Sequence, residues 1–287
     1  MQEREIEDLV DSVIDEFRHF DLDPTGAKQE HAADPAYLRA HRHEYVRTVR
    51  DLVEFAARHP VRSVLEIGAF FGVVCICAAK LGFYTVAADI PEYMSLKEQQ
   101  DRFGNHGIEV AEVRLEDYVM PFEDERFDAV IMCEVLEHLN FNPLPLIKEI
   151  NRIGAPNSLF YLSLPNLAKL GNRMKLVRGV SNLTPIQDYF NQLDPTKIEI
   201  ANGHWREYTA AEIREMLERL GYEIESQYYF SLGETQPPVN LRKRLSQRFY
   251  RTFPALKENQ TTLAVRRRRS DVVFHLPDTV HRGLDRI

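Results

Sequence analysis

The sequence predicts an α/β protein with a doubly wound, largely parallel sheet, and three observations lead to this prediction. Short apolar runs alternate with helical segments of about ten to fifteen residues through the middle of the chain. The runs show little alternation of apolar and polar residues, which is typical of strands buried on both faces. The length of 287 residues suits one large domain or two small ones, at roughly 100–200 residues per domain.

Composition excludes several classes of protein. Hydrophobic residues make up 44% and charged residues 28% of the chain, as in globular rather than disordered proteins. The longest uncharged apolar stretch, residues 67–79, is shorter than the about 20 residues that span a bilayer. Residues 1–20 are acidic and interrupted by charges, unlike a signal peptide. Three cysteines are too few for a disulfide framework, so we expect a reduced, cytoplasmic location.

The charge is unevenly distributed along the chain. Lysine and arginine number 36 against 44 aspartate and glutamate residues, a formal net charge of −8 that argues against nucleic acid as a partner. Residues 1–23 are acidic, whereas residues 239–269 hold ten bases and one acid, Glu258. The basic segment 239–269 could therefore meet the acidic N-terminus or an anionic partner.

Two helices are predicted before the first strand. Apolar residues at spacings of three and four predict an amphipathic helix over residues 3–20. A second helical pattern covers about residues 36–58 and ends at His59-Pro60. We expect residues 1–60 to form a helical cap that closes over the sheet as a lid.

Strands and helices then alternate. The predicted strands are residues 61–68, 83–89, 108–114, 127–133, 158–164, 222–230 and 259–267. The helices expected between them are residues 72–81, 95–103, a segment after Pro143, 208–221 and 238–250. The helix after Tyr208 starts with a capping box, in which Thr209 is the N-cap and Glu212 follows three residues later.

The segment VLEIGAFFG, residues 64–72, carries most of the chemical information. An acid at a strand end, a glycine turn and a helix N-terminus form a site for a zwitterion. The backbone N–H groups attract a carboxylate, while Glu66 favours a nearby cation. Asp89 ends the next strand, where it can accept hydrogen bonds from ribose hydroxyls. A dinucleotide site is excluded, because Phe70 and Val73 stand where its fingerprint needs glycine.

Two blocks of the sequence resemble one family. Glu66, Gly68 and Gly72 resemble motif I of class I S-adenosylmethionine-dependent methyltransferases, written E/D-x-G-x-G-x-G, with Phe70 at the middle glycine. The segment MPFEDERFDAVIMCEVLEHL, residues 120–139, is similar to the fourth-strand region of the same superfamily. Together the two blocks, in this order and spacing, identify the chain as similar to these methyltransferases.

The resemblance covers residues 61–165 and resumes from 204 to 268. It implies a Rossmann-like seven-stranded sheet whose last strand, TTLAVRR, is antiparallel. On this basis the chain divides into a helical cap at 1–60, a cofactor-binding half at 61–165, an acceptor-side insertion at 166–205, the C-terminal part of the sheet at 206–269 and a tail of unknown role at 270–287.

S-adenosylmethionine is the cofactor that the resemblance implies, with S-adenosylhomocysteine as its product. Within the family an acid after the third strand contacts the adenine amine, and Glu116 and Asp117 both fit that place. Ile90 is where an apolar side chain covers the adenine, and Cys133 and Glu134 lie near the methionine part. The candidate cofactor residues are Glu66, Gly68, Ala69, Phe70, Gly72, Asp89, Ile90, Glu116, Asp117, Cys133 and Glu134.

Methyl transfer to a hydroxyl needs the acceptor held in line with the methyl group, and a base for the hydroxyl proton. Histidine suits that task near neutral pH. His138 lies just past the fourth strand, and His204 lies just before the capped helix. A subgroup of the family has H-x-R-x-Y-T before this helix and a fifth strand ending in P-N, as Pro165-Asn166 does here. We predict His138 or His204 as the base. The candidate acceptor residues are Asn166, Arg206 and Tyr208.

No metal site is predicted. The ten histidines include no pair at ligand spacing with carboxylates. His41 and His43 of one predicted helix point to different faces. Cys75 and Cys77 lack a partner pair and lie among small apolar residues, so we expect them to be buried.

The acceptor is predicted from one further resemblance. PNLAKLGNRMKLVRG, residues 165–179, is similar to a stretch in bacterial methyltransferases associated with polysaccharide and cell-envelope glycan assembly. It implies O-methylation of a sugar or glycan hydroxyl. Two alternatives are a methyltransferase of a small aromatic or polyketide-like metabolite, which Tyr189, Phe190 and Trp205 would favour, and a non-catalytic partner that keeps the fold.

Residues 239–251 predict a basic amphipathic helix. Such a helix can lie on an anionic membrane, which would suit a lipid-linked acceptor. The alternative is that its apolar face packs on the sheet. The sequence leaves the oligomeric state open.

Overall fold

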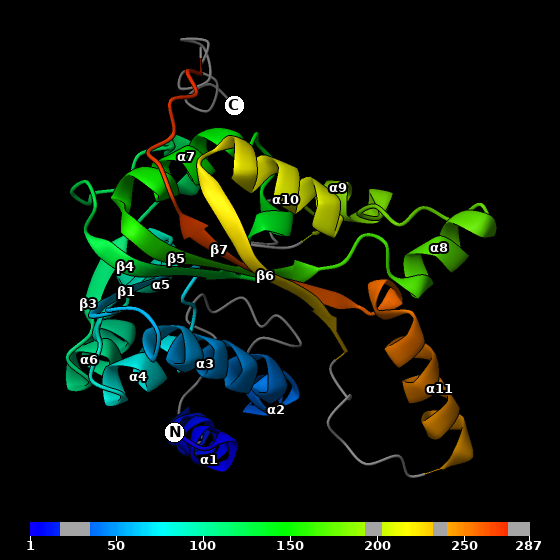
Figure 1. Cartoon of the computed structure of the whole chain (residues 1–287), viewed down its shortest axis with the longest axis horizontal. Helices are drawn as coiled ribbons and strands as arrows, with labels where there is room; N and C mark the ends of the chain where they lie inside the picture. Colours follow the sequence, from blue (N-terminus) through cyan, green and yellow to red (C-terminus); the bar gives the residue numbers. More distant parts are fainter. Residues whose placement is uncertain (18–34, 193–202, 232–239, 275–287) are drawn as a thin grey trace.

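The computed structural model describes residues 1–17, 35–192, 203–231 and 240–274. Within them a twisted seven-stranded sheet runs in the order β3-β2-β1-β4-β5-β7-β6, with helices on both faces (Figure 1). Strands β1 to β5 pair in parallel, whereas β7 runs antiparallel to both of its neighbours. This is the doubly wound, Rossmann-like sheet with an antiparallel last strand that the sequence predicts.

The strands agree closely with the predicted segments. They are β1 (Ser63–Ile67), β2 (Tyr84–Asp89), β3 (Glu109–Glu112), β4 (Phe127–Cys133), β5 (Gly154–Pro165), β6 (Tyr222–Phe230) and β7 (Asn259–Arg266). Strand β5 begins earlier than predicted because Gly154 pairs with Phe127, and a register shift separates that pair from the regular ladder.

The helices show two breaks that the sequence does not predict. They are α1 (Glu3–Glu16), α2 (Pro35–Ala40), α3 (Arg42–Ala56), α4 (Val73–Lys80), α5 (Pro91–Met94), α6 (Lys97–Asn105), α7 (Leu144–Ile153), α8 (Leu170–Val177), α9 (Ile186–Gln192), α10 (Ala210–Arg219) and α11 (Leu241–Thr252). Short 3-10 helices within the described ranges include η2 (Leu115–Asp117), η3 (Leu136–His138) and η4 (Pro254–Leu256). The segment predicted as 36–58 divides at His41, and the helix expected near 95–103 is preceded by the short α5.

The helix after Tyr208 begins as the sequence predicts. Thr209 Oγ1 accepts the Glu212 N–H at 3.3 Å, and the Glu212 carboxylate accepts the Thr209 N–H at 2.8 Å. This reciprocal pair satisfies two donors at the start of α10. It also fixes the chain direction directly after the segment that carries His204.

Helices α1 and α3 belong to the same apolar core as β1 and α4. Val10, Val49 and Leu52 are fully buried within it. The acidic face of α1 pairs with nearby bases, among them Arg42, whose Nη2 lies 2.7 Å from Asp11. Within the described residues, the acids of the N-terminal helix therefore pair with bases that lie next to them. On the opposite face of the sheet a second core includes residues of α7 and α10.

Helix α11 does not pack its apolar face on the sheet, so that alternative is wrong. Leu241 and Leu245 are 71% and 59% exposed, and no residue of α11 is buried. Figure 1 shows α8 and α11 projecting at the same end of the molecule. No helix in the described ranges is long and apolar enough to cross a bilayer.

Some sequence predictions concern residues outside those ranges. They are the end of the helix over 3–20, part of the insertion at 166–205, the start of the helix over 238–250 and most of the tail at 270–287. The boundaries of the five predicted segments stay a prediction.

Candidate functional site

The loop after β1 has the backbone path that its glycines require. Gly68 and Gly72 have φ angles of 74° and 72°. A Cβ at either position would lie 2.2 Å from a side-chain atom, of Val135 and Phe103 respectively. Phe70, between them, holds a φ of 47°, a conformation that glycine adopts at lower cost. Ala69 beside it is buried.

The Phe70 ring lies in an aromatic cluster at this loop. Its centroid is 3.8 Å from that of Phe71, 5.3 Å from that of Tyr93 and 6.3 Å from that of Tyr37. The Gln99 amide donates to the Phe70 carbonyl at 2.9 Å. Tyr37 belongs to the N-terminal helices, so these helices reach the predicted cofactor loop. No sequence motif surrounds Tyr37 and Tyr93, so the sequence does not predict their place at this loop.

Asp89 ends β2 beside the same loop. Its carboxylate accepts the N–H of Phe70 at 2.8 Å through Oδ2 and the N–H of Ile90 at 2.7 Å through Oδ1. Burial raises the pKa of Asp89 to about 6, against the lowering effect of these two N–H groups. Each oxygen keeps a further lone pair, so the carboxylate fits the hydroxyl donors of a ribose. Ile90 follows directly, as the N-cap of α5.

Glu66 is buried and its carboxylate accepts the Cys75 N–H at 2.9 Å, in the first turn of α4. Burial raises its pKa to about 7, although the Cys75 hydrogen bonds oppose the rise. This carboxylate therefore ties β1 to the N-terminus of α4. Cys75 and Cys77 are buried, as predicted.

Glu116 and Asp117 lie together in η2, directly after β3, and both are exposed. Arg114 Nη1 lies 3.9 Å from Glu116 Oε1. The geometry of η2 does not separate the two acids as the adenine contact. Cys133 ends β4, where its Sγ lies 3.8 Å from the Thr48 hydroxyl of α3.

Two buried carboxyl groups follow β4. Glu134 has a φ of 53° and donates its N–H to the Ser163 carbonyl at 2.9 Å. Glu137 is 0% exposed. Glu134 Oε1 and both carboxyl oxygens of Glu137 are buried and accept no hydrogen bond from another described residue, but the two carboxyl groups lie within hydrogen-bond reach of each other. Burial raises the pKa of Glu137 to about 7, and burial together with the Glu137 charge raises that of Glu134 well above its ordinary value.

The structure brings the two candidate histidines together. The ring centroids of His138 and His204 are 4.9 Å apart, with the rings at 89°. The Glu137 carbonyl accepts the Trp205 N–H at 2.8 Å and so fastens the His204 segment to η3. His138 Nδ1 donates to the Gly203 carbonyl at 3.2 Å. Burial, and then His204, lower the pKa of His138 to about 4.

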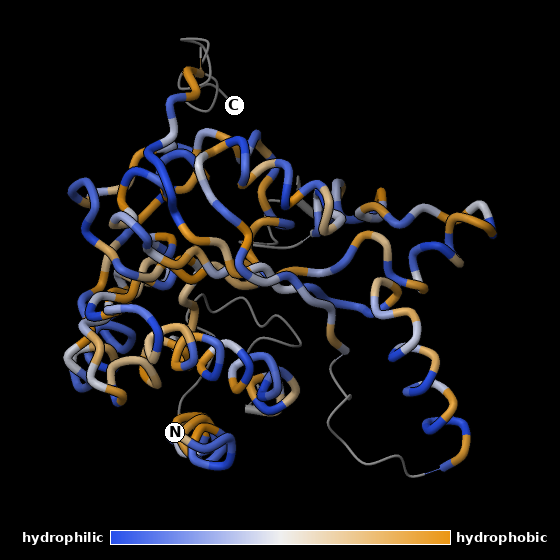
Figure 2. The backbone as a smooth tube through the Cα atoms, in the orientation of Figure 1, coloured by the Kyte–Doolittle hydropathy of each residue, from blue (hydrophilic) through white to orange (hydrophobic). Residues whose placement is uncertain are grey.

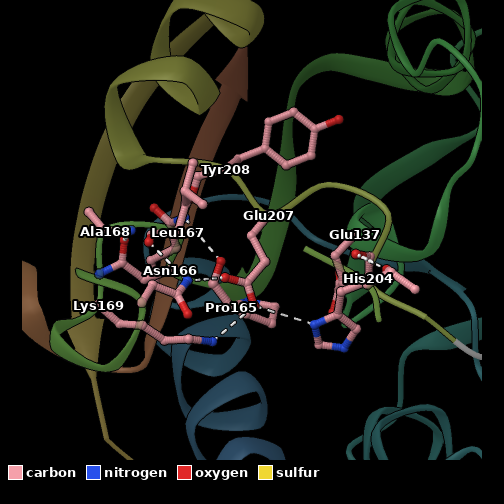
Figure 3. A network of polar contacts seen from close by, with 12 residues as sticks. Glu137, Pro165, Asn166, Leu167, Ala168, Lys169, His204, Glu207 and Tyr208 are labelled. Atoms are coloured by element: carbon pink, nitrogen blue, oxygen red, sulfur yellow. Dashed lines mark hydrogen bonds and ion pairs between the residues drawn. The ribbon is translucent and has the colours of Figure 1, made fainter. Parts of the chain in front are cut away.

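Glu207 orients the His204 ring (Figure 3). His204 Nδ1 lies 3.4 Å from Glu207 Oε1, and Lys169 Nζ lies 2.9 Å from the same oxygen. Asn172 donates to the other oxygen at 2.6 Å. Burial alone would raise the pKa of Glu207, but the hydrogen bonds from His204, Lys169 and Asn172 lower it to about 2. Glu207, and Glu137 within EVLEHL, are functional candidates that the sequence does not predict.

Two of the three predicted acceptor residues have structural contacts instead. Asn166 is fully buried, and its amide donates to the carbonyls of Ala255 and Lys257, both at 2.9 Å. The Asn166 side chain therefore fastens two backbone segments. Tyr208 is 6% exposed and packs in the second apolar core. Arg206 remains exposed, 2.9 Å from Glu212.

One cluster has metal-ligand chemistry. Glu137, His138 and His204 each offer one ligand atom, and these atoms lie within 4.8 Å of one another. Sequence spacing could not predict this cluster, because His204 comes from a segment distant in the chain.

A comparison with protein families decides the identity. Residues 38–227 match the family described as Methyltransferase domain. The chain belongs to this methyltransferase family. A search of curated proteins finds no match for this methyltransferase. Family and sheet topology together indicate S-adenosylmethionine as the cofactor, as the sequence predicts.

Solved structures of other methyltransferases share the fold. In the complex of the Haloferax volcanii Trm112 methyltransferase activator with a methyltransferase, the TM-score is 0.52 at 16% identity, over 90% of this chain and 98% of that one. A SAM-dependent methyltransferase from Archaeoglobus fulgidus gives a TM-score of 0.50 at 16% identity, over 81% of this chain and 100% of that one. Magnesium protoporphyrin IX methyltransferase from Synechocystis PCC 6803 with bound SAH also gives a TM-score of 0.50 at 16% identity, over 80% of this chain and 86% of that one.

Proposed function

We propose that this methyltransferase methylates a hydroxyl of a sugar or glycan, with the acceptor bound beside His138 and His204. The observation that carries the proposal is the juxtaposition of these two imidazoles, whose ring centroids are 4.9 Å apart; His138 follows β4 and His204 precedes α10. The carboxyl ends of parallel strands are where ligands bind in open α/β sheets.

The residues of the carboxyl edge fit the cofactor. Asp89 accepts the ribose hydroxyls with its remaining lone pairs, and Ile90 covers the adenine while Glu116 or Asp117 meets its amine. Glu134 Oε1, which is buried and accepts no hydrogen bond from a described donor, suits the ammonium group of the methionine part. When bound, S-adenosylmethionine supplies an electrophilic methyl group whose C–S bond breaks as the acceptor oxygen forms the new C–O bond.

His204 is the better placed of the two to take the hydroxyl proton. Its side chain is 43% exposed, and its Nδ1 is directed at Glu207, which leaves Nε2 for the acceptor. A base whose ring is oriented by a carboxylate is the usual arrangement for activating a hydroxyl. His138 packs against this ring, and Arg206 is the exposed cation nearest in sequence for acceptor binding.

The proposal is tested with the purified protein, labelled S-adenosylmethionine and a panel of nucleotide sugars and glycans. We expect methylation of a sugar hydroxyl, and His204→Ala and His138→Ala to lower turnover by about 10²–10⁴-fold with cofactor affinity unchanged. His106→Ala, which removes the C-cap histidine that follows α6, is the control and keeps full turnover. Cofactor binding without methylation of any acceptor would favour a non-catalytic role instead.

A small aromatic acceptor is the second candidate. Tyr189 of α9 and Trp205 lie close together, with ring centroids 5.1 Å apart, and Phe190 is 65% exposed. These rings could bind a planar acceptor beside His204. Methylation of phenolic compounds but not of sugars in the same panel would favour this candidate.

We also propose that α8 and α11, here called the basic end, rest on an anionic membrane. Leu176 and Val177 of α8 are 57% and 81% exposed, and α11 exposes Leu241 and Leu245. Figure 2 shows hydrophobic and hydrophilic residues interspersed along both helices. The bases of these helices and their ends are Arg173, Lys175, Arg178, Arg242, Lys243, Arg244, Arg248 and Arg251. Exposed apolar side chains among bases suit a lipid surface, which supports a lipid-linked glycan acceptor and a place at the cytoplasmic face.

Vesicle sedimentation tests the basic end. We expect the protein to bind vesicles containing about 30% phosphatidylglycerol. The Leu245→Asp variant should lose most of that binding, since a carboxylate opposes both the apolar contact with the lipid and the attraction to its anionic head groups. Val119→Asp, at an exposed apolar residue distant in sequence, is the matched control and binds as the unaltered protein does. Equal binding of Leu245→Asp would contradict the membrane contact.

A further inference from the structure

We infer that Glu137, His138 and His204 bind a divalent transition-metal ion. Their ligand atoms lie within 4.8 Å of one another, and they come from η3 and from the segment before α10. Two imidazoles and one carboxylate form a donor set that suits zinc and its first-row neighbours. Magnesium and calcium prefer oxygen ligands, so this site should discriminate against them.

The buried carboxyl groups at this place accept no hydrogen bond from a cation among the described residues. Glu137 is 0% exposed, and neither of its carboxyl oxygens accepts a hydrogen bond from another residue within the described ranges. The nearest imidazole nitrogen, His138 Nε2, lies 3.9 Å from Glu137 Oε1, which is too far for a hydrogen bond. The carboxyl group of Glu134 lies within hydrogen-bond reach of that of Glu137, but it brings no positive charge. Buried charges of this kind are normally paired or bound to a metal.

The rings of both histidines are already held as metal ligands usually are. His138 donates its Nδ1–H to the Gly203 carbonyl at 3.2 Å, and His204 Nδ1 lies 3.4 Å from the Glu207 carboxylate. A backbone carbonyl and a carboxylate are the common outer partners of metal-binding histidines. Glu207 is itself held by Lys169 and Asn172. Both Nε2 atoms therefore remain available for an ion, and a movement of about 1 Å would bring the ligands to bonding separation.

The position of the site suggests what the ion does. Glu137 and His138 directly follow β4 and its predicted methionine contacts, so the ion would lie on the acceptor side. Three protein ligands leave at least one coordination position open, where an acceptor hydroxyl can bind and lose its proton to water more readily. This consequence rests on the proposed function and replaces the free imidazole base by a bound cation. The binding of the ion does not rest on it.

Calorimetric titration of the metal-stripped protein with Zn²⁺, and separately with Mg²⁺, tests the inference. We expect one Zn²⁺ per chain and no measurable Mg²⁺ binding. Glu137→Gln and His204→Ala should weaken Zn²⁺ binding at least about 100-fold, and Glu207→Gln about 10–100-fold. His106→Ala is the matched control with unchanged affinity, and circular dichroism establishes that each variant is folded. The visible spectrum of the Co²⁺ form separates imidazole and carboxylate ligands from cysteine thiolates.

Each outcome separates this inference from the proposed function. No Zn²⁺ binding at tens of micromolar, or binding that His204→Ala leaves unchanged, overturns the metal site. If Zn²⁺ does not bind but His204→Ala still abolishes methylation, the proposal that His204 acts as the base is supported and the proposal of a bound cation is wrong. If one Zn²⁺ binds and the variants weaken it while no acceptor is methylated, the metal site stands and the proposed reaction falls.

Discussion

Phe70 and Glu134 place backbone strain at the two sides of the predicted cofactor site. Both hold left-handed conformations without being glycine, with φ angles of 47° and 53°. Such conformations cost of order 1–3 kcal/mol each and persist where the surrounding structure fixes them. Here aromatic packing fixes Phe70, and the hydrogen bond to Ser163 fixes Glu134.

Asp89 gives the first prediction at this scale. Asp89→Asn should weaken S-adenosylmethionine binding about 10–100-fold, because a hydrogen bond to a charged acceptor contributes about 1.5–3 kcal/mol. Calorimetric titration of the variant measures the change. Glu92→Gln, at a nearby exposed acid, should bind with the original affinity. If Asp89→Asn also binds with that affinity, the ribose assignment is wrong.

Glu66 gives a prediction on pH and stability. Its pKa is raised by burial from 4.5 to about 7, so between these values the folded chain binds more protons than the unfolded chain. The free energy of unfolding therefore falls as pH rises through this window, by about 3 kcal/mol from this residue, and then levels off. Glu66→Gln should make this fall smaller by about 3 kcal/mol in urea unfolding curves measured from pH 4.5 to 8. The contributions of Asp89 and Glu137, whose pKa values are also raised, should remain.

The control for Glu66 is an exposed acid. Glu98→Gln on α6 should leave the pH dependence of the unaltered protein in place. Parallel pH profiles for the unaltered protein and Glu66→Gln would show that Glu66 does not carry the effect.

At the scale of elements, helix starts and strand cores follow local rules, whereas helix breaks do not. The capping box at Thr209 and the apolar strand β4 lie where the sequence predicts them. The break at His41 has no proline or glycine to mark it, and it separates α2 from α3. The exposure of the apolar face of α11 likewise cannot be predicted from periodicity, because the same amphipathic pattern suits a helix packed on a core and a helix on a membrane surface.

The capping box gives the prediction for elements. Thr209→Ala should lower the free energy of unfolding by about 1 kcal/mol, because the Glu212 N–H loses its acceptor. Urea unfolding measures it. Thr252→Ala at the end of α11, an exposed threonine, should change stability by less than about 0.5 kcal/mol. A Thr209→Ala variant as stable as the Thr252→Ala control would contradict the contribution of the cap.

At the scale of the whole molecule, the N-terminal helices take part in the main core and in the predicted cofactor site. Val10 of α1 and Leu52 of α3 are fully buried in the core that contains β1, and Tyr37 reaches the Phe70 cluster. A lid that closes over a finished domain would bury less apolar surface on that domain. The helices therefore contribute to folding as well as covering the sheet.

Truncation tests the role of α1. Removing residues 1–17 should lower the free energy of unfolding by several kcal/mol, since it uncovers buried apolar side chains of the core. Thermal and urea unfolding of the truncated chain measure the loss. Val10→Ala is a milder variant, for which we expect a loss of about 1–3 kcal/mol. If both variants are as stable as the full chain, α1 is a detachable cover.

The sequence by itself determined the sheet, the glycine loop, Asp89 at the end of β2 and the separate positions of His138 and His204. These features depend on local spacing and on the fixed geometry of a parallel sheet. Tertiary structure decided that His138 and His204 meet, that Glu137 is buried beside them and that Glu207 orients one ring. It also showed Asn166 and Tyr208 in structural contacts. The reason is physical: such contacts depend on how loops distant in sequence fold onto one another, which no short-range pattern records.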